Sequence, residues 1–190
     1  MTSRLHAAAA AYGALTARHL WLQPLVSSSL ATGGDVVAQT WGEGARLSEL
    51  DTRRTAAFSA FGLVYSGVVI PRWFGFLARN VHPRVAPFQG WSQPATVGAK
   101  VLVDMCVQAP FSYMPAFYIG TGMIRGQSFG EACEKLREKY VESVKVCWQV
   151  FTPSQLINFT LVPPQLRVVW ANSVAFAWVV GLSLLANRGQ

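Results

Sequence analysis

The chain has 190 residues, of which 52% are hydrophobic and only 13% are charged, and its formal net charge is +7. A soluble domain carries about 25% charged residues, so this composition leaves little material for a water-facing surface. The basic excess does not indicate a nucleic-acid partner, because the sequence has no Lys/Arg-rich run and no basic stripe with interleaved aromatic residues. The composition therefore excludes an ordinary soluble domain and favours a protein embedded in a lipid bilayer.

The N-terminal segment, residues 1–19, contains no acidic residue and holds an alanine-rich stretch between Arg4 and Arg18. An Arg-containing, acid-free, Ala-rich start is typical of a mitochondrial presequence. It is equally well explained as the polar start of a membrane protein, so both interpretations stay open. Residues 20–190 are interpreted as one membrane domain.

The first predicted span, residues 20–41, is apolar but carries Asp35 and Gln39. These two residues are four positions apart and therefore share one face of a helix. Gly34 and Ala38 also share a face, and small residues at this spacing allow neighbouring helices to approach closely. We expect a spanning helix whose polar face is turned toward other helices.

The second and last predicted spans, residues 55–77 and 168–186, are the most uniformly apolar parts of the chain. No charged residue falls within residues 55–70 or within residues 168–187. About 20 apolar residues are needed for a helix to cross a hydrocarbon core of roughly 30 Å. Both segments are therefore predicted to be lipid-facing helices.

The third predicted span, residues 95–124, has two charged residues, Lys100 and Asp104, on one helical face. A charge at the bilayer centre costs about 2.5–3.5 kcal/mol on insertion scales, so such residues pair or face a cavity. Their spacing allows them to pair with each other along the helix. Pro110 and Pro115 are expected to kink the same helix.

An amphipathic helix is predicted for residues 128–147, between the third and last spans. Ser128 and Glu131 have the spacing of a capping box, and apolar residues then recur every three or four positions. The other face carries four acidic and four basic residues. The following stretch, 148–166, is interrupted by Pro153 and Pro163, and is interpreted as a short embedded helix or a re-entrant segment.

The candidate functional side chains are the polar groups inside the apolar segments: Asp35, Gln39, Lys100, Asp104, Gln108, Gln155, Asn158, Arg167 and Asn172. Polar residues at membrane depth are functional candidates, and they either line an aqueous path or bond helices together at about 0.6 kcal/mol each. Both alternatives stay open. The prolines expected to shape the helices are Pro110, Pro115, Pro153 and Pro163.

No catalytic, metal or cofactor site is predicted. The three histidines are scattered, the three cysteines form no C-x-x-C pair, and no nucleophile–base motif is present. Gly120, Gly122 and Gly126 approach a dinucleotide-binding spacing, but the last glycine is one position late and the segment follows a helix rather than a strand. We therefore expect neither an enzyme nor a nucleotide-binding protein.

The stretch from Trp148 to Phe159, followed by Val162-Pro163 and Arg167, resembles the C-terminal signature of the family that contains the twenty-two-kilodalton peroxisomal membrane protein and Mpv-seventeen. Weaker similarities lie in the expected order along the rest of the chain, although Val68 and Met105 depart from the usual pattern. The resemblance implies a four-span, non-catalytic protein of the mitochondrial inner membrane or, alternatively, the peroxisomal membrane.

Two functions follow from these expectations. The first is a weakly selective channel for small solutes or ions that contributes to organelle homeostasis, as some members of the family are. The alternative is a scaffold, a homo-oligomer or an accessory subunit of a larger membrane complex. Four crossings would place both chain ends and the Pro-rich segment between the second and third spans on one side of the membrane.

Overall fold

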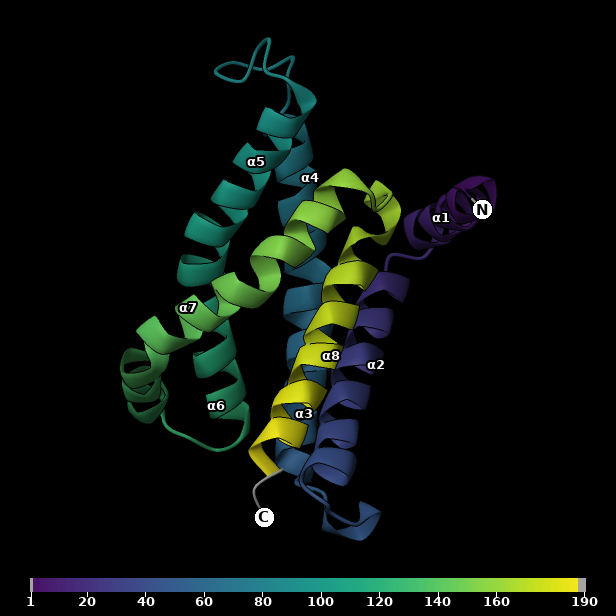
Figure 1. The fold of residues 1–190 in the computed structure, drawn as a ribbon. Helices are drawn as coiled ribbons and strands as arrows, with labels where there is room; N and C mark the ends of the chain where they lie inside the picture. The colour runs from purple at the N-terminus through teal and green to yellow at the C-terminus, as the bar shows by residue number, and fades with distance from the viewer. Residues whose placement is uncertain (1, 188–190) are drawn as a thin grey trace.

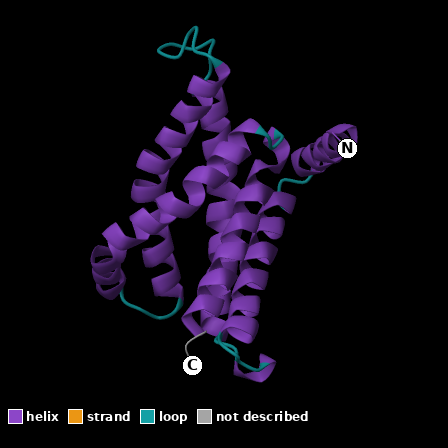
Figure 2. Cartoon of the chain, in the orientation of Figure 1, coloured by secondary structure: helices purple, strands orange, loops and turns teal. Residues whose placement is uncertain are grey.

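The computed structural model describes the backbone of residues 2–187 and the side chains of residue 4 and residues 6–180. Met1 and residues 188–190, which the sequence analysis assigned to the N-terminal segment and the membrane domain, lie outside the described residues. Within residues 2–187 the regular structure is helical throughout (Figure 2). The prediction of an all-α fold is therefore confirmed.

The helices form six rods. They are α1 (Thr2–Arg18); α2 (Leu22–Val37) with a π-helical extension (Ala38–Gly42); α3 (Thr52–Phe61), a π-helical segment (Gly62–Val69) and α4 (Ile70–Asn80); α5 (Gln93–Val103), two π-helical segments (Asp104–Tyr113 and Ala116–Gly120) and α6 (Thr121–Ile124); α7 (Phe129–Thr160); and α8 (Arg167–Asn187). Short 3-10 turns lie at Leu47–Glu49 and Pro164–Leu166. Each of the four predicted spans falls on one of these rods.

One rod among the described residues, Thr52–Asn80, is both long enough and apolar enough to cross a membrane by length and composition. It has 29 residues, and 28% of its most apolar stretch is buried inside the protein. The number of membrane crossings therefore stays a prediction.

The rod α3–α4 packs antiparallel against α2, and two glycines permit close contact. A Cβ atom at Gly67 would lie 2.4 Å from the Cα of Pro24, and one at Gly62 would lie 2.8 Å from the carbonyl oxygen of Ser27. No side chain fits at either position without moving the backbone of α2. The α5–α6 rod in turn runs antiparallel to α3–α4, as the contacts of Tyr65 with Ser112 and of Trp73 with Asp104 show.

The last helix, α8, runs parallel to α2 and to the α5–α6 rod (Figure 1). Asn172 bonds to Ser27, and Phe176 packs on Gly34, so both helices progress in the same direction. Helix α7 crosses the bundle obliquely and connects the end of the α5–α6 rod to the start of α8. The arrangement differs from the four-crossing expectation, because α2 begins and α8 ends at opposite ends of the bundle.

Helix α7 is longer than the predicted amphipathic helix and continues through Pro153 to Thr160. The predicted break at Pro153 is absent: the helix continues through this exposed proline, which removes one backbone N–H donor without ending the helix. The capping box is present: Ser128 Oγ accepts from the Glu131 backbone N–H, and Glu131 accepts from the Ser128 N–H. The Ser128 hydroxyl and the Ser128 backbone N–H both donate hydrogen bonds to the Glu131 carboxylate, and these bonds lower the pKa of Glu131, which is fully exposed.

The other prolines act differently. Pro110 lies inside a π-helical segment, whose wider turn accommodates the missing N–H donor without ending the helix. Pro115 joins two helical segments of the same rod. Pro163 precedes the 3-10 turn between α7 and α8, so it marks a true helix boundary.

The N-terminal helix α1 lies at the end of the bundle where α2 begins (Figure 1). Tyr12 donates a hydrogen bond to Gln23, and Gly13 lies against the side chain of Gln165. The acid-free segment is therefore helical and contacts both α2 and the turn that precedes α8. Its targeting role stays a prediction.

Candidate functional site

Two fully buried carboxylates lie inside the bundle, Asp35 on α2 and Asp104 on the α5–α6 rod, with exposed fractions of 0% and 1%. A buried carboxylate is costly unless it is paired or hydrogen-bonded. The groups around these two residues therefore define the polar interior. The two environments differ in kind.

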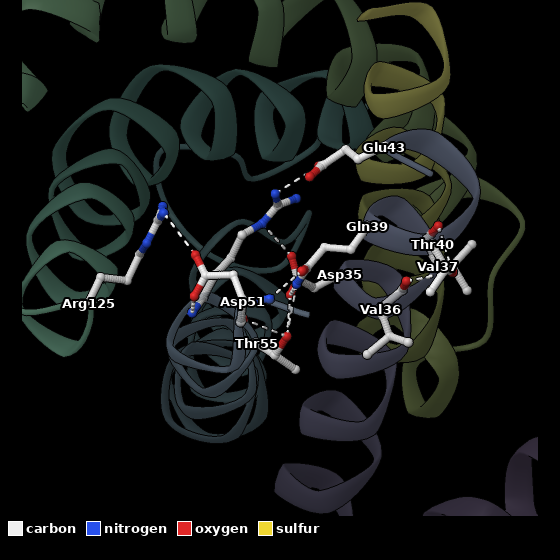
Figure 3. Close-up of polar contacts among 10 residues, drawn as sticks. Asp35, Val36, Val37, Gln39, Thr40, Glu43, Asp51, Thr55 and Arg125 are labelled. Carbon is white, nitrogen blue, oxygen red and sulfur yellow. Dashed lines mark hydrogen bonds and ion pairs between the residues drawn. The ribbon is translucent and has the colours of Figure 1, made fainter. Parts of the chain in front are cut away.

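Asp35 forms an ion pair with Arg54, whose Nε lies 2.6 Å from Asp35 Oδ1 (Figure 3). The same guanidinium also contacts Glu43 Oε1 at 2.8 Å. The second carboxylate oxygen of Asp35 accepts hydrogen bonds from Gln39 at 2.8 Å and Thr55 at 2.7 Å. These contacts connect the end of α2 to the start of α3, and we call Asp35, Gln39, Arg54 and Thr55 the Asp35 cluster.

The Asp35 cluster continues into the connection between these helices. Gln39 Oε1 accepts a hydrogen bond from the backbone N–H of Asp51 at 2.7 Å. Asp51 caps α3 by accepting from the N–H of Arg54, and its carboxylate lies 3.4 Å from Arg125 beyond the end of α6 (Figure 3). Three rods are therefore joined by charged and polar contacts at one end of the bundle.

Asp104 has a different set of partners. It accepts hydrogen bonds from Trp73 Nε1 and from Gln155 Nε2, both at 2.6 Å. The pairing with Lys100 that the spacing allows is not formed: among the described residues the ion pairs do not include Lys100, and Asp104 bonds to residues of α4 and α7 instead. A buried carboxylate is thus held by two neutral donors from two other rods.

A chain of amides extends this second group, which we call the Asp104 cluster (Trp73, Asp104, Gln155 and Asn158). Asn158 donates to Gln155 Oε1 at 2.7 Å and to the backbone carbonyl of Arg167 at 3.3 Å. The Arg167 guanidinium lies 5.4 Å from the centre of the Phe159 ring and donates to two carbonyls near the end of α7. Arg167 thus closes the turn between α7 and α8.

A cavity of about 710 Å³ lies between the rods, and all of the long rods contribute to its wall. Of the predicted polar residues, four line it: Asp104, Gln108, Gln155 and Asn172. Most of the remaining wall is apolar or aromatic. The volume falls within the range of roughly 300–1,000 Å³ that is typical of small-molecule sites.

The two ends of the cavity differ. One end is lined by Glu43, Arg54, Lys139 and Glu142, and Glu142 is 74% exposed, so the cavity reaches the surface there. At the other end Phe74 and Met105 belong both to the wall and to the largest apolar core of the described residues, so that core forms a floor beside Asp104. The cavity wall therefore has charged, partly exposed side chains in one part, which we call the charged mouth, and buried apolar side chains near Asp104.

The structure brings together only part of the predicted set. Asp35 and Gln39 lie at the mouth end but face α3 rather than the cavity, while Lys100, Asn158 and Arg167 lie outside the wall. Sequence reasoning did not assign roles to Arg54, Trp73 or Tyr65. Tyr65 accepts from Gln108 at 3.0 Å and donates to Ser112 at 2.7 Å, which fixes the middle of the cavity wall.

The position of Arg54, next to an otherwise uncharged apolar run, could have identified it as the partner of a buried acid. No sequence signal identifies Trp73, because a tryptophan near a span end is ordinarily an interface residue. Among the described residues no group of three or more His, Cys, Asp or Glu side chains could hold a metal ion.

The described residues form an all-helical fold with one rod that is long and apolar enough to cross a membrane, which fits the class of membrane proteins. The sequence model of the Mpv17 / PMP22 family matches residues 122–183. The chain is 31% identical over 178 residues to the mitochondrial inner membrane protein Mpv17 of Danio rerio, which covers 93% of this chain and 96% of that protein. The chain belongs to the Mpv17 / PMP22 family, whose members are membrane proteins of mitochondria and peroxisomes.

Two further relatives cover most of the chain. It is 32% identical over 174 residues to Protein SYM1 of Gibberella zeae, covering 92% of this chain and 94% of that protein. It is 30% identical over 169 residues to PXMP2/4 family protein 2 of Dictyostelium discoideum, covering 84% and 83%. These names support the expected localisation in the mitochondrial inner membrane, with the peroxisomal membrane as the alternative, and none of the three names an enzyme. No solved structure matches the chain.

Proposed function

We propose that the protein provides a pathway for small solutes or ions through an organelle membrane. The observation that supports this function is the 710 Å³ cavity, which opens at a charged mouth and extends to the buried Asp104. Interior polar groups that only joined helices would need no such space, because protein interiors are close-packed and contain few voids larger than a water molecule. The cavity thus favours the pathway over a purely structural role for Asp104 and Gln108.

In this proposal the four rods that carry the predicted spans cross the bilayer, and α7 completes the wall between two of them. The apolar floor near Phe74 and Met105 closes the pathway in this conformation. Conduction then requires that α4, α5 or α7 shift at the Asp104 cluster, where all three are joined. The protein has no catalytic role in this proposal.

The test is conductance of the purified full-length protein in planar lipid bilayers. We expect channel events above those of an empty-membrane control, and a changed conductance or ion selectivity in Asp104→Asn. Lys100→Gln is the matched control, because Lys100 lies one helical turn from Asp104 but does not line the cavity. Wild-type protein that gives no events would rule out the pathway.

The second candidate is a scaffold or accessory subunit, favoured by the outer face of α7. Exposed acidic and basic side chains follow one another along this face, including Glu134, Arg137, Glu138 and Lys145, and none of these four lines either cavity. Gentle detergent extraction separates the two functions. Stable co-migration with a large complex would favour the scaffold, whereas a monomer or small oligomer would favour the pathway.

A further inference from the structure

A second, smaller pocket of about 190 Å³ lies beside the charged mouth of the cavity. Its wall comes from α3, from the α5–α6 rod and the turn after it, and from α7. The lining residues are Arg54, Phe58, Phe117, Tyr118, Thr121, Gly122, Arg125, Gln127 and Lys135. Three of these side chains are basic and none is acidic.

The three basic residues come from separate parts of the chain, so their convergence is a product of the fold. Arg54 has its carboxylate partners in Asp35 and Glu43. Arg125 has a long contact of 3.4 Å with Asp51, and among the described residues no ion pair involves Lys135. Like charges placed together repel, and an anion between them would relieve that repulsion.

Half of the other residues in the pocket wall are aromatic. Phe117 meets Phe58 edge-on with ring centres 5.8 Å apart, and Tyr118 meets Phe117 edge-on at 5.6 Å. The hydroxyl groups nearby are occupied, since Thr121 bonds to the carbonyl of Phe117 and Tyr118 bonds to Ser143. A ligand with an apolar part and an acidic group could therefore pack its apolar part on the aromatic side chains and pair its acidic group with the basic ones.

Four residues, Arg54, Phe58, Phe117 and Tyr118, line both the pocket and the large cavity. The two spaces therefore share a wall, and a ligand in the pocket lies beside the mouth. We propose that the pocket is a binding site for a small organic anion, a carboxylate or phosphate group carried on an aromatic or apolar body. That the anion then enters the cavity rests on the proposed pathway function, whereas binding itself does not.

Phosphate groups also occur on lipid headgroups, so the experiment has to distinguish a bound lipid from a bound soluble anion. The probe is phenyl phosphate, titrated calorimetrically into full-length protein in nanodiscs of phosphatidylcholine, with inorganic phosphate as the probe without a ring. We expect phenyl phosphate to bind more tightly than inorganic phosphate. The proposal would be overturned if phenyl phosphate did not bind, or if it bound no more tightly than inorganic phosphate. It would also be overturned if only anionic lipids stabilised the protein.

The variant is Arg125→Gln with Lys135→Gln, which removes two exposed charges and leaves Arg54 in its ion pair. We expect binding to weaken by about tenfold, the effect of losing one or two partly exposed charged hydrogen bonds. The matched control is Arg137→Gln with Lys145→Gln, which removes the same charge from exposed positions of α7 outside both cavities. An equal loss in the control would show a general charge effect and overturn the site.

Uptake of phenyl phosphate into liposomes separates this inference from the pathway. Binding without uptake would leave the anion site standing and contradict the pathway. Uptake that is the same in the Arg125/Lys135 variant and in wild type would support the pathway and contradict entry of the anion by way of the pocket. Thermal unfolding of each variant, followed by circular dichroism, confirms that the compared proteins are folded.

Discussion

The Asp35 cluster and the Asp104 cluster each hold one buried carboxylate, but only the first supplies an ionic partner. Asp35 lies 2.6 Å from an arginine nitrogen, whereas Asp104 is held by an indole and an amide. A buried ion pair is strongly disturbed when one partner is removed, because the other charge is left uncompensated. A carboxylate with neutral donors loses less when its own charge is removed. The first cluster is therefore suited to fixing the rods, and the second to responding to what occupies the cavity.

The largest effect is expected for Arg54→Ala, which leaves Asp35 buried without its cation. The free energy of unfolding should fall by about 3–5 kcal/mol, measured by denaturation in detergent. Arg53→Ala, at the exposed neighbouring position, is the control and should change little. A loss below about 1 kcal/mol in Arg54→Ala would show that Asp35 has another compensating partner.

A smaller loss is expected for Trp73→Phe, which removes one donor to Asp104 and keeps a ring against Phe76. The cost should be about 1–3 kcal/mol, that of a buried acceptor deprived of a hydrogen bond. Trp41→Phe is the control, because Trp41 is 75% exposed. If both variants unfold at the same temperature as wild type, the indole bond does not hold α4 against the α5–α6 rod.

The comparison is most direct between Asp104→Asn and Asp35→Asn. Asp104→Asn removes two charge-assisted hydrogen bonds, which destabilises the protein. It also removes the cost of burying a charge, which stabilises it, so stability should change by about 1 kcal/mol or less in either direction. Asp35→Asn should lose more, because Arg54 then keeps only its contact with the exposed Glu43. Melting temperatures measured side by side test the order, and a reversed order would contradict the distinction between the clusters.

The smallest effect is expected for Lys100→Gln. Among the described residues, half-buried Lys100 has no ion pair and lies outside the cavity wall, so its replacement by glutamine should change stability by no more than about 0.5 kcal/mol. Thermal unfolding of this variant together with Asp104→Asn measures whether the two residues are coupled. A double variant whose stability departs from the sum of the single changes by more than about 0.5 kcal/mol would restore the pairing that the spacing allows.

The sequence predicted the rods well, because uncharged runs and the capping box at Ser128 are local signals. The continuation of α7 through Pro153 was missed, because a proline can kink a helix without ending it and the sequence does not show which of the two occurs. Asp35 with Gln39 was recognised as a polar face from spacing alone. The partners of Asp104 were not, because Trp73 and Gln155 are 31 and 51 residues away and meet it only through packing.

The parallel direction of α2 and α8 affects which side of the membrane each end of the bundle faces. If both helices cross the bilayer, the start of α2 and the end of α8 are exposed to different compartments, and oblique α7 accounts for the additional pass. A protease or a membrane-impermeant label would then reach the two ends from opposite sides. A fusion placed after α8 would report on a different aqueous space from the one that α1 occupies.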